Sequence, residues 1–600
     1  MLFNSLRPYL LLLLIINLLL FQIYSLSSIN LYMPFSFSGD ALVHQAAIKS
    51  MLEEGWLLRS NYIGMPDGFN WLDFPAFNYS VLHFLIIKML SVFSSNSDLL
   101  ANVFYLLGFS LIALSSFWVF KQNDICNSLS ISFAVLYAFA PYHLYKQTNH
   151  LLLSSYYTIP LVVLVFIWLF KGEIHFSFHE KKITANTKFW LSILFLFVMA
   201  ISDGYYTAFS LMFLFFTVVI SFFFIQNYKT KELLFLILIF FAVMFISFGT
   251  LQLFVKYNEF VNGKINIFAK HFIESEHYGL KIRSMLSTVE GSIFSEIYPN
   301  FMHLLRIESP GNFSEASLIE FGPIGAIGFI TLSLLFLFHK KQVYFNRLGV
   351  DNQKDINMLI GLSYLSLFVV LFSVKGGLAT IFALFYPSVR VWARVSIILL
   401  FISFFSIGFL LNLIKNISLK RSLSFLVLIV GILGQVPYNW LIHGIDFDKA
   451  NQKTYMEEAK FVEDITNKIG ANSKVLYIPM YCFPDRDAIS RDLQPYKDLM
   501  PYLHSSNNIQ WSSNSAEGRN SCNLLRNINN IISVNLDLAI TKIKAAGFNG
   551  IYIDISDDIY LRAKSEEFYR TKKIYQELLK KYDGKALYSD SRNQVFFKLT

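Results

Sequence analysis

Apolar residues dominate the first three quarters of the chain, in runs long enough to enter or cross a lipid bilayer. A bilayer has a hydrocarbon core about 30 Å thick, so a spanning helix needs about 20 mostly apolar residues. Such runs lie near 9–27, 99–120, 127–142, 151–170, 189–201, 207–227, 232–256, 318–338, 356–374, 395–414 and 422–442. The pattern predicts a mainly α fold, a polytopic membrane helix bundle of about eleven transmembrane helices within residues 1–445.

The pattern changes after residue 445, where apolar content falls and charges become frequent. The apolar positions there predict three strands at 474–479, 551–554 and 594–599, and two helices at 536–546 and 564–582. Residues 446–600 are therefore expected to form a C-terminal soluble α/β domain.

The composition agrees with lipid as the main solvent of this chain. Hydrophobic residues make up 54% and charged residues only 15% of the sequence. A soluble protein of this length needs more polar side chains to cover its surface. The formal net charge of +9 comes mainly from Lys and Arg beside the apolar runs, so we expect no nucleic-acid partner.

The loop charges predict the orientation in the membrane. With a cytoplasmic N-terminus, the inner segments carry Arg7, Lys121, Lys171, Lys181, Lys182, Lys188, Lys229, Lys231, Lys340, Lys341, Arg347, Lys354, Lys415, Lys420 and Arg421. The short outer loops carry only Lys146, Lys375, Arg390 and Arg394. This positive-inside bias predicts outer loops at 28–78 and 257–317, and an outer tail. The apolar stretch 79–94 is expected to lie along the outer interface. We expect a multi-pass protein of the bacterial cytoplasmic membrane.

Two of the three cysteines, Cys482 and Cys522, lie in the tail, on the oxidising side of the membrane in this topology. A disulfide between them is compatible with that side, and two free thiols are the alternative.

Asp40 follows Gly39 soon after the first apolar run. An acidic group close to the membrane surface is well placed as a general base or as a cation ligand. The structural alternative is an N-cap, because a helical pattern begins at Ala41 and Asp is a favoured capping residue.

The rest of the first outer loop interleaves aromatic rings with acidic and amide side chains. Rings of this kind stack on sugar faces, and the polar groups bind hydroxyls. The candidate sugar-binding residues are Glu54, Trp56, Asp67, Asn70, Trp71 and Asp73. An interfacial aromatic belt with turn residues explains the same pattern equally well.

Ionisable groups next to apolar helices are costly and often functional. His150, Asp203 with its neighbour Tyr205, and Glu276 of the second outer loop are therefore added as substrate-binding candidates. Helix caps and headgroup contacts are the alternative.

Four cations, Lys281, Arg283, Arg390 and Arg394, stand on the outer side against the charge bias. Arg offers a two-pronged donor to phosphate, so these residues are candidates for holding a lipid phosphate. Simple anchoring to headgroups is the alternative. The sequence contains no Walker A, dinucleotide-binding or zinc-hydrolase motif.

The order of these parts resembles the GT-C class of integral membrane glycosyltransferases, among bacterial proteins of the YfhO-like or uncharacterised GT-C-like type. The matching pieces are Gly39-Asp40, the segment through Pro75, the stretch 79–94 and the tail. The resemblance implies a polyprenyl-phosphate-linked sugar donor, a glycan, lipid or protein acceptor on the outer face, and Asp40 as the catalytic base. No paired acidic motif stands at Asp40, so a divalent cation, Mg²⁺ or Mn²⁺, remains an open question. A transporter or flippase of lipid-linked glycans and a non-catalytic envelope assembly protein are the alternative functions.

Overall fold

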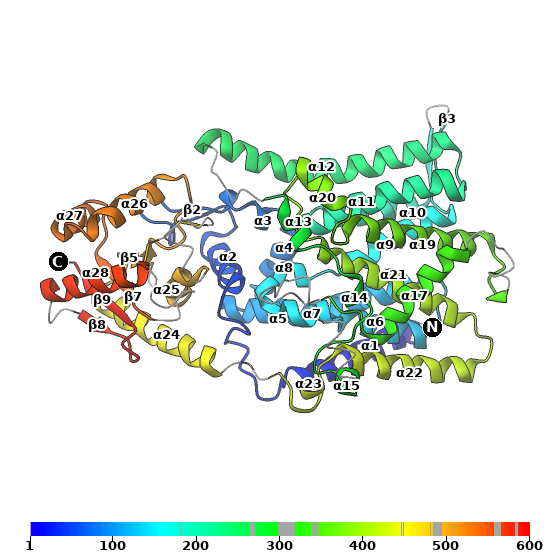
Figure 1. Ribbon diagram of the computed structural model, residues 1–600, viewed down its shortest axis with the longest axis horizontal. Coiled ribbons are helices and arrows are strands. Elements are labelled where there is room, and N and C mark those ends of the chain that lie inside the picture. The colour runs from blue at the N-terminus through cyan, green and yellow to red at the C-terminus, as the bar shows by residue number, and fades with distance from the viewer. Residues whose placement is uncertain are drawn as a thin grey trace.

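A computed structural model describes residues 2–179, 182–263, 271–297, 319–338, 345, 347–445, 447, 449–480, 482–483, 495–506, 508–556, 566–582 and 586–599. Most of these residues are helical. Figure 1 shows an elongated molecule, with a bundle of long helices on the right and a smaller domain with strands on the left. The N-terminus lies at the far end of the bundle, and the C-terminus lies in the smaller domain. The predicted fold class, a helix bundle followed by an α/β domain, is confirmed.

Every apolar run of the sequence corresponds to a helix. Seven helices are long and apolar enough to cross a membrane. They are α1 (Leu2–Ile23), α5 (Ser97–Lys121), α11 (Gly204–Ile220) with its extension to Ile225, α12 (Thr230–Asn262), α19 (Gln353–Ser373), α21 (Ser396–Asn412) and α22 (Ile417–Gln435). The described residues therefore hold fewer full-length spans than the eleven predicted.

The remaining runs form helices that are shorter or broken. The chain from α6 (Asn127–Ala138) to α9 (Ile159–Lys171) makes one bent pair, with an angle of 74° between its parts. α10 (Thr187–Ala200) has 14 residues and α17 (Gly322–Phe338) has 17. Pro141 lacks an amide hydrogen and ends the first run, and the turn before Gly204 ends α10. These interruptions place His150 and Asp203 at helix ends, on the side that the sequence predicts to be outer.

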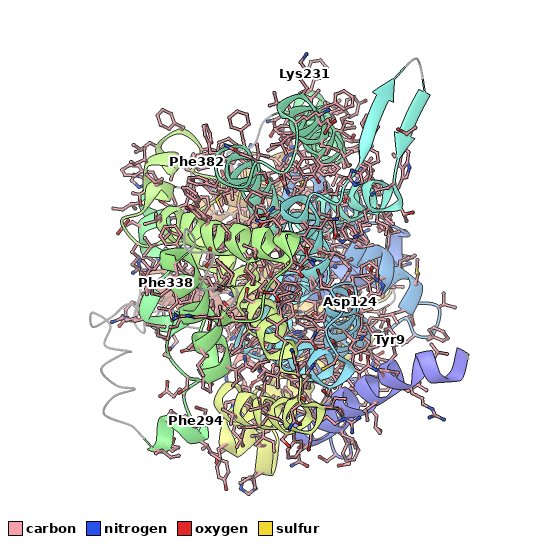
Figure 2. The ribbon with its side chains drawn as sticks, turned by 90° about the vertical axis from the view of Figure 1, so that its right-hand side faces the viewer. Tyr9, Asp124, Lys231, Phe294, Phe338 and Phe382 are labelled. Carbon is pink, nitrogen blue, oxygen red and sulfur yellow. A yellow bond between two sulfur atoms is a disulfide. The ribbon has the colours of Figure 1, made fainter. Side chains whose placement is uncertain are left out.

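The predicted inner loops meet at one end of the bundle, which Figure 2 views end-on. The ammonium group of Lys171 lies 3.0 Å from a carboxylate oxygen of Asp355. The side chain of Asn412 accepts a hydrogen bond from the amide of Cys126 and donates one to the carbonyl of Asp124, which is labelled in Figure 2. Loops that share the predicted cytoplasmic side therefore lie together. Lys340 and Lys341 fall outside the described residues.

The tail forms a five-stranded sheet in the order β6-β5-β7-β9-β8. β5 (Lys474–Ile478), β7 (Gly550–Asp554) and β9 (Gln594–Lys598) confirm the three predicted strands, and α27 (Leu536–Ala545) and α28 (Glu566–Tyr582) confirm the two helices. β6 (Gln510–Trp511) pairs parallel with β5, and β8 (Ala586–Tyr588) pairs antiparallel with β9. We call this sheet and its helices the tail domain.

Alternating residues send side chains to opposite faces of the tail sheet. Ile551 and Ile553 of β7 pack on one face with α26 (Asn520–Ile532), α27 and α28. Tyr552 packs on the other face with α24 (Lys449–Ile469). A disulfide joins Cys482 to Cys522, with 5.6 Å between their Cα atoms, so the question left open by the sequence is answered in favour of the bond.

The first outer loop lies between the bundle and the tail domain. It contains α2 (Asp40–Glu54), β1 (Arg59–Ser60), β2 (Phe69–Asn70), η1 (Trp71–Asp73) and α3 (Pro75–Asn78), and α4 (Val81–Leu90), within the stretch 79–94, follows it. The amide of Met65 donates to the carbonyl of Trp511, and the amide of Trp511 donates to the carbonyl of Tyr62. The loop thus adds backbone hydrogen bonds at β6 and fastens the tail domain to the outer end of the bundle.

Candidate active site

Asp40 is the first residue of α2, and its carboxylate does not cap the helix. The N-cap position belongs to Gly39, which makes no side-chain capping bond and has a φ of +53°, a conformation that suits glycine. The N-cap interpretation of Asp40 is therefore wrong. Its side chain is 46% exposed, and its Oδ2 lies 3.4 Å from Nδ1 of His150.

His150 belongs to a short segment that turns back at the outer end of the bundle. After Pro141 the chain forms α7 (Pro141–Lys146) and then the 3₁₀ helix η2 (Gln147–His150). α2 packs against η2, and Ser36 donates a hydrogen bond of 2.7 Å to Oδ1 of Asn149. These contacts hold His150 against the start of α2.

Two buried cations accompany the pair of Asp40 and His150. Lys146 is 4% exposed and Arg394 is 8% exposed. Lys146 interacts electrostatically with both Arg394 and Asp40, and His150 interacts with both cations. Burial and the charge of Arg394 hold the pKa of Lys146 well below its usual value. The site therefore combines one accessible carboxylate with the guanidinium of Arg394 and the amine of Lys146 in a poorly hydrated place, where charge interactions are stronger than in water.

Arg394 comes from η5 (Trp392–Val395), immediately before α21. Its guanidinium carbon lies 4.3 Å from the centre of the Tyr205 ring. Asp203 attracts Arg394 and also caps α11, because its Oδ1 accepts a 3.0 Å hydrogen bond from the amide of Tyr206. The capping interpretation of Asp203 is confirmed. The same carboxylate helps to hold Arg394 near the site.

The second outer loop supports this arginine segment. Arg390 donates a 2.8 Å hydrogen bond to Glu274 and interacts with Tyr205. Glu276 accepts hydrogen bonds from the amide of Gly376 and the hydroxyl of Thr380. These contacts join α13 (Ile273–His277) to the turn before α20 (Leu378–Phe385) and to the segment before η5.

Lys281 and Arg283 stand at the start of α14 (Ile282–Met285), close enough to Lys375 for mutual repulsion. Partial burial and the charges of Lys375 and Arg283 lower the pKa of Lys281 to about 8. These three residues form a second cationic group, and the predicted role of Lys281 and Arg283 in phosphate binding stays a prediction.

The first-loop candidates are engaged in packing between the bundle and the tail domain. Trp71 is fully buried and donates to the hydroxyl of Ser50, and Asp73 is ion-paired with Arg519 at 2.5 Å. The other contacts are those of Glu54 with the amide of Asn61, Asp67 with Ser521, Asn70 with Asn258, and Trp56 with the apolar core. Sugar binding by these residues stays a prediction.

His44 and Lys146 complete the site and were not among the sequence candidates. A ring nitrogen of His44 lies 2.6 Å from the carbonyl oxygen of Asp40. Burial lowers the pKa of His44 below its usual value, although the charge of Asp40 acts in the opposite direction. The spacing of four residues from Asp40 places His44 on the same face of α2, which is a signal that the sequence contains.

Among the described residues, the groups shown beside Asp40 would offer a divalent cation one carboxylate and two imidazoles. Mg²⁺ and Mn²⁺ prefer several oxygen ligands. Here the carboxylate of Asp40 lies 3.4 Å from His150 and interacts electrostatically with His44 and Lys146. The one potential metal-binding group found among the described residues is Cys482, Glu517 and Cys522, and its two sulfurs are joined in the disulfide.

No protein-family model matches the chain, and no curated protein matches its sequence. Among solved structures, the chain is similar to the oligosaccharyltransferase AglB of Archaeoglobus fulgidus, in complex with an inhibitory peptide and a dolichol-phosphate. The identity is 11%, the TM-score is 0.49, and the match covers 99% of this chain and 74% of the other. It is also similar to ArnT of Cupriavidus metallidurans bound to undecaprenyl phosphate, with 11% identity, a TM-score of 0.43, and coverage of 99% and 98%. At this identity the likenesses concern the fold alone.

Proposed function

We propose that this protein transfers a sugar from a polyprenyl-phosphate-linked donor to an acceptor hydroxyl at the outer membrane–water interface. The observation that carries the proposal is the arrangement of Asp40, His150, Lys146 and Arg394 at the outer end of the bundle. A base close to fixed positive charges is what displacement of a phosphate leaving group requires.

Asp40 is the general base in this proposal. Its carboxylate takes the proton of the acceptor hydroxyl while the acceptor oxygen bonds to the anomeric carbon of the sugar. The bond from that carbon to the phosphate oxygen breaks, and the electron pair leaves with the phosphate. Attack opposite the leaving group inverts the configuration at the anomeric carbon.

Arg394 stabilises the negative charge that develops on the departing phosphate, and the amine of Lys146 can donate a hydrogen bond to the same group. Arg394 is buried, so its charge is weakly screened. The stack of Arg394 on Tyr205 and its attraction to Asp203 hold the guanidinium in place before the substrate arrives. Fixed charges of this kind lower the barrier because they need no rearrangement during the reaction.

His150 and His44 orient the base. The imidazole of His150 lies beside one carboxylate oxygen of Asp40, and the ring of His44 lies beside the backbone carbonyl of the same residue. The 46% exposure of Asp40 leaves its carboxylate accessible to an acceptor.

The test follows label from lipid to product in membranes of cells grown with a tritiated hexose. Wild-type membranes are expected to move label from the fraction that dissolves in organic solvent to a polar fraction. Asp40→Asn keeps the shape of the side chain and removes its basicity, so transfer should fall at least about 100-fold. Asp590→Asn is the matched control, since Asp590 pairs with Lys460 on the surface of the tail domain. Equal transfer by wild type and a folded, inserted Asp40→Asn would contradict the proposal.

A further inference from the structure

Helix α2 connects the candidate active site to the tail domain. Its first residue is Asp40, and its second half carries Lys49 and Glu53, which face α25 (Met500–His504) of the tail domain. Figure 1 shows α2 between the bundle and the tail domain. A helix of 15 residues is about 22 Å long and stiff, so a displacement of one end of α2 also moves the other end.

Lys49 binds the end of α25. Its ammonium group donates hydrogen bonds of 2.8, 3.1 and 2.7 Å to the carbonyl oxygens of Tyr502, Leu503 and Ser505. The last carbonyls of a helix have no partner within that helix and carry partial negative charge, so a cation satisfies them well. Lys49 of α2 thus supplies hydrogen-bond donors to the carbonyl oxygens at the C-terminal end of α25 in the tail domain.

Glu53 makes a second connection one turn later. Its carboxylate accepts a 2.7 Å hydrogen bond from the hydroxyl of Tyr502 and lies 3.8 Å from the ammonium of Lys49. The side chain of Lys49 is 13% exposed and that of Glu53 is 29% exposed. Lys49 has little access to water, so its ammonium depends on these carbonyl and carboxylate partners, and loss of them would leave a largely buried charge without hydrogen bonds.

The tail domain also contacts the N-terminal end of α5. Tyr455 of α24 donates a 2.7 Å hydrogen bond to Asp98. The ring of His504 packs between Tyr455, at 4.4 Å, and Phe37, at 5.6 Å. Phe37 precedes Asp40 by three residues, so the tail domain contacts the chain on both sides of the candidate base.

We infer that the tail domain positions Asp40 against His150 through helix α2, and that Lys49 is the positioning residue. The far half of α2 is fixed by α25, and its first turn meets η2. The expected effect on the rate of sugar transfer rests on the proposed function, whereas the positioning of Asp40 through α2 does not. The tail domain therefore acts on the rate of transfer without contributing a reacting group.

The experiment uses the full-length protein in lipid nanodiscs and measures amide hydrogen exchange along α2. Lys49→Met removes the ammonium and keeps the apolar stem. We expect exchange to rise in residues 41–46, three to eight residues before the substitution, and to fall back towards the wild-type level in Lys49→Arg. Lys453→Met is the matched control, because Lys453 also pairs with a Glu four residues later but lies exposed on α24.

The same variants are then compared in transfer of label from the polyprenyl-linked pool. Lys49→Met should lower kcat roughly 10- to 100-fold with little change in the KM for donor, because displacement of a reacting group by about 1 Å has an effect of this size. Lys49→Arg should restore most of the loss. Tyr502→Phe removes one hydrogen bond and leaves the carbonyl contacts of Lys49, so it provides a mild variant with a smaller effect of the same kind.

Unchanged exchange at residues 41–46 in Lys49→Met, or a loss confined to KM, would overturn the inference. The exchange result is independent of the transfer chemistry. If Asp40→Asn proves active, the proposed function fails, while a rise in exchange in Lys49→Met still supports the connection through α2.

Discussion

Oδ2 of Asp40 and Nδ1 of His150 lie 3.4 Å apart, although the two residues stand on opposite sides of α5 in the sequence. Asp40 begins α2, and His150 ends a short 3₁₀ helix at the outer end of the bundle. Their pairing depends on packing of the first outer loop against the turn after α7. It brings an accessible carboxylate together with Lys146, which interacts with Asp40, and with Arg394, which interacts with Lys146 and His150.

Arg394 provides a first test of the charge arrangement. Arg394→Met removes the guanidinium, so we expect transfer to fall about 100-fold or more, as for the loss of one fixed donor at a developing negative charge. Arg394→Lys should restore little of this, because a lysine cannot reproduce the planar group that stacks on Tyr205. The transfer rates of wild type, Arg394→Met and Arg394→Lys are compared in membranes of equal protein content. Full activity in Arg394→Lys would show that only the positive charge at this position matters.

The ion pair of Asp73 and Arg519 should stabilise docking of the tail domain. Asp73 is 2% exposed in its side chain, and its two oxygens accept from both Arg519 and Asn258. Removal of one partner from a buried pair costs about 3–5 kcal/mol. Asp73→Asn should therefore make the tail domain markedly more sensitive to limited proteolysis. Glu457→Gln, which breaks an exposed pair with Lys453, should leave the cleavage rate unchanged.

His504 should make the docked state sensitive to acid. Burial, and to a smaller extent the charge of Lys49, lowers the pKa of His504 to about 3, from 6.5 for an exposed histidine. When the pH falls below 6.5, the undocked chain binds a proton that the docked chain does not bind until about pH 3. Stability is thus lost over that interval, by about 2 kcal/mol at pH 5.

The comparison of wild type with His504→Phe isolates this effect, because other titrating groups are common to both. Unfolding in urea at pH 7 and pH 5 should show a larger loss for the wild type than for the variant. The phenylalanine keeps the ring contacts with Tyr455 and Phe37. Identical pH dependence in the two proteins would contradict the expected role of this histidine.

Donor binding by the cationic group around Lys281 should depend on pH. With a pKa of about 8, Lys281 is mostly charged at pH 7 and mostly neutral at pH 9. If it holds a phosphate, as the sequence predicts, the KM for donor should rise several-fold between these values. Lys281→Met should show the high KM for donor at both pH 7 and pH 9. A KM independent of pH in the wild type would remove Lys281 from the binding site.

The sequence predicts the large elements well, because long apolar runs and alternating strands are properties of local sequence. It misses β6 and β8, since Gln510–Trp511 and Ala586–Tyr588 are too short to show a period. Trp71 and Asp73 are candidate sugar ligands in the sequence, and the fold adds that Trp71 is buried against Ser50 and that Asp73 is ion-paired with Arg519 of the tail domain. Only tertiary packing distinguishes a buried carboxylate from an accessible one.

The candidate site likewise could be predicted only in part from the sequence. Asp40, His150, Asp203 and Arg394 can each be nominated from the sequence, because each is an ionisable group close to an apolar run on the side predicted to be outer. Lys146 has the same property and was missed, since its burial beside Arg394 depends on the bend after Pro141. Their assembly requires four separate segments to meet, which no local pattern encodes.

The most direct measurement separates donor binding from chemistry at Asp40. Purified wild type and Asp40→Asn, in nanodiscs, are given tritium-labelled polyprenyl-linked donor extracted from the same membranes, and bound lipid and transferred sugar are counted separately. We predict equal donor binding and a transfer rate at least about 100-fold lower in Asp40→Asn, because only the base has been removed. Equal transfer rates in the two folded proteins would contradict the account.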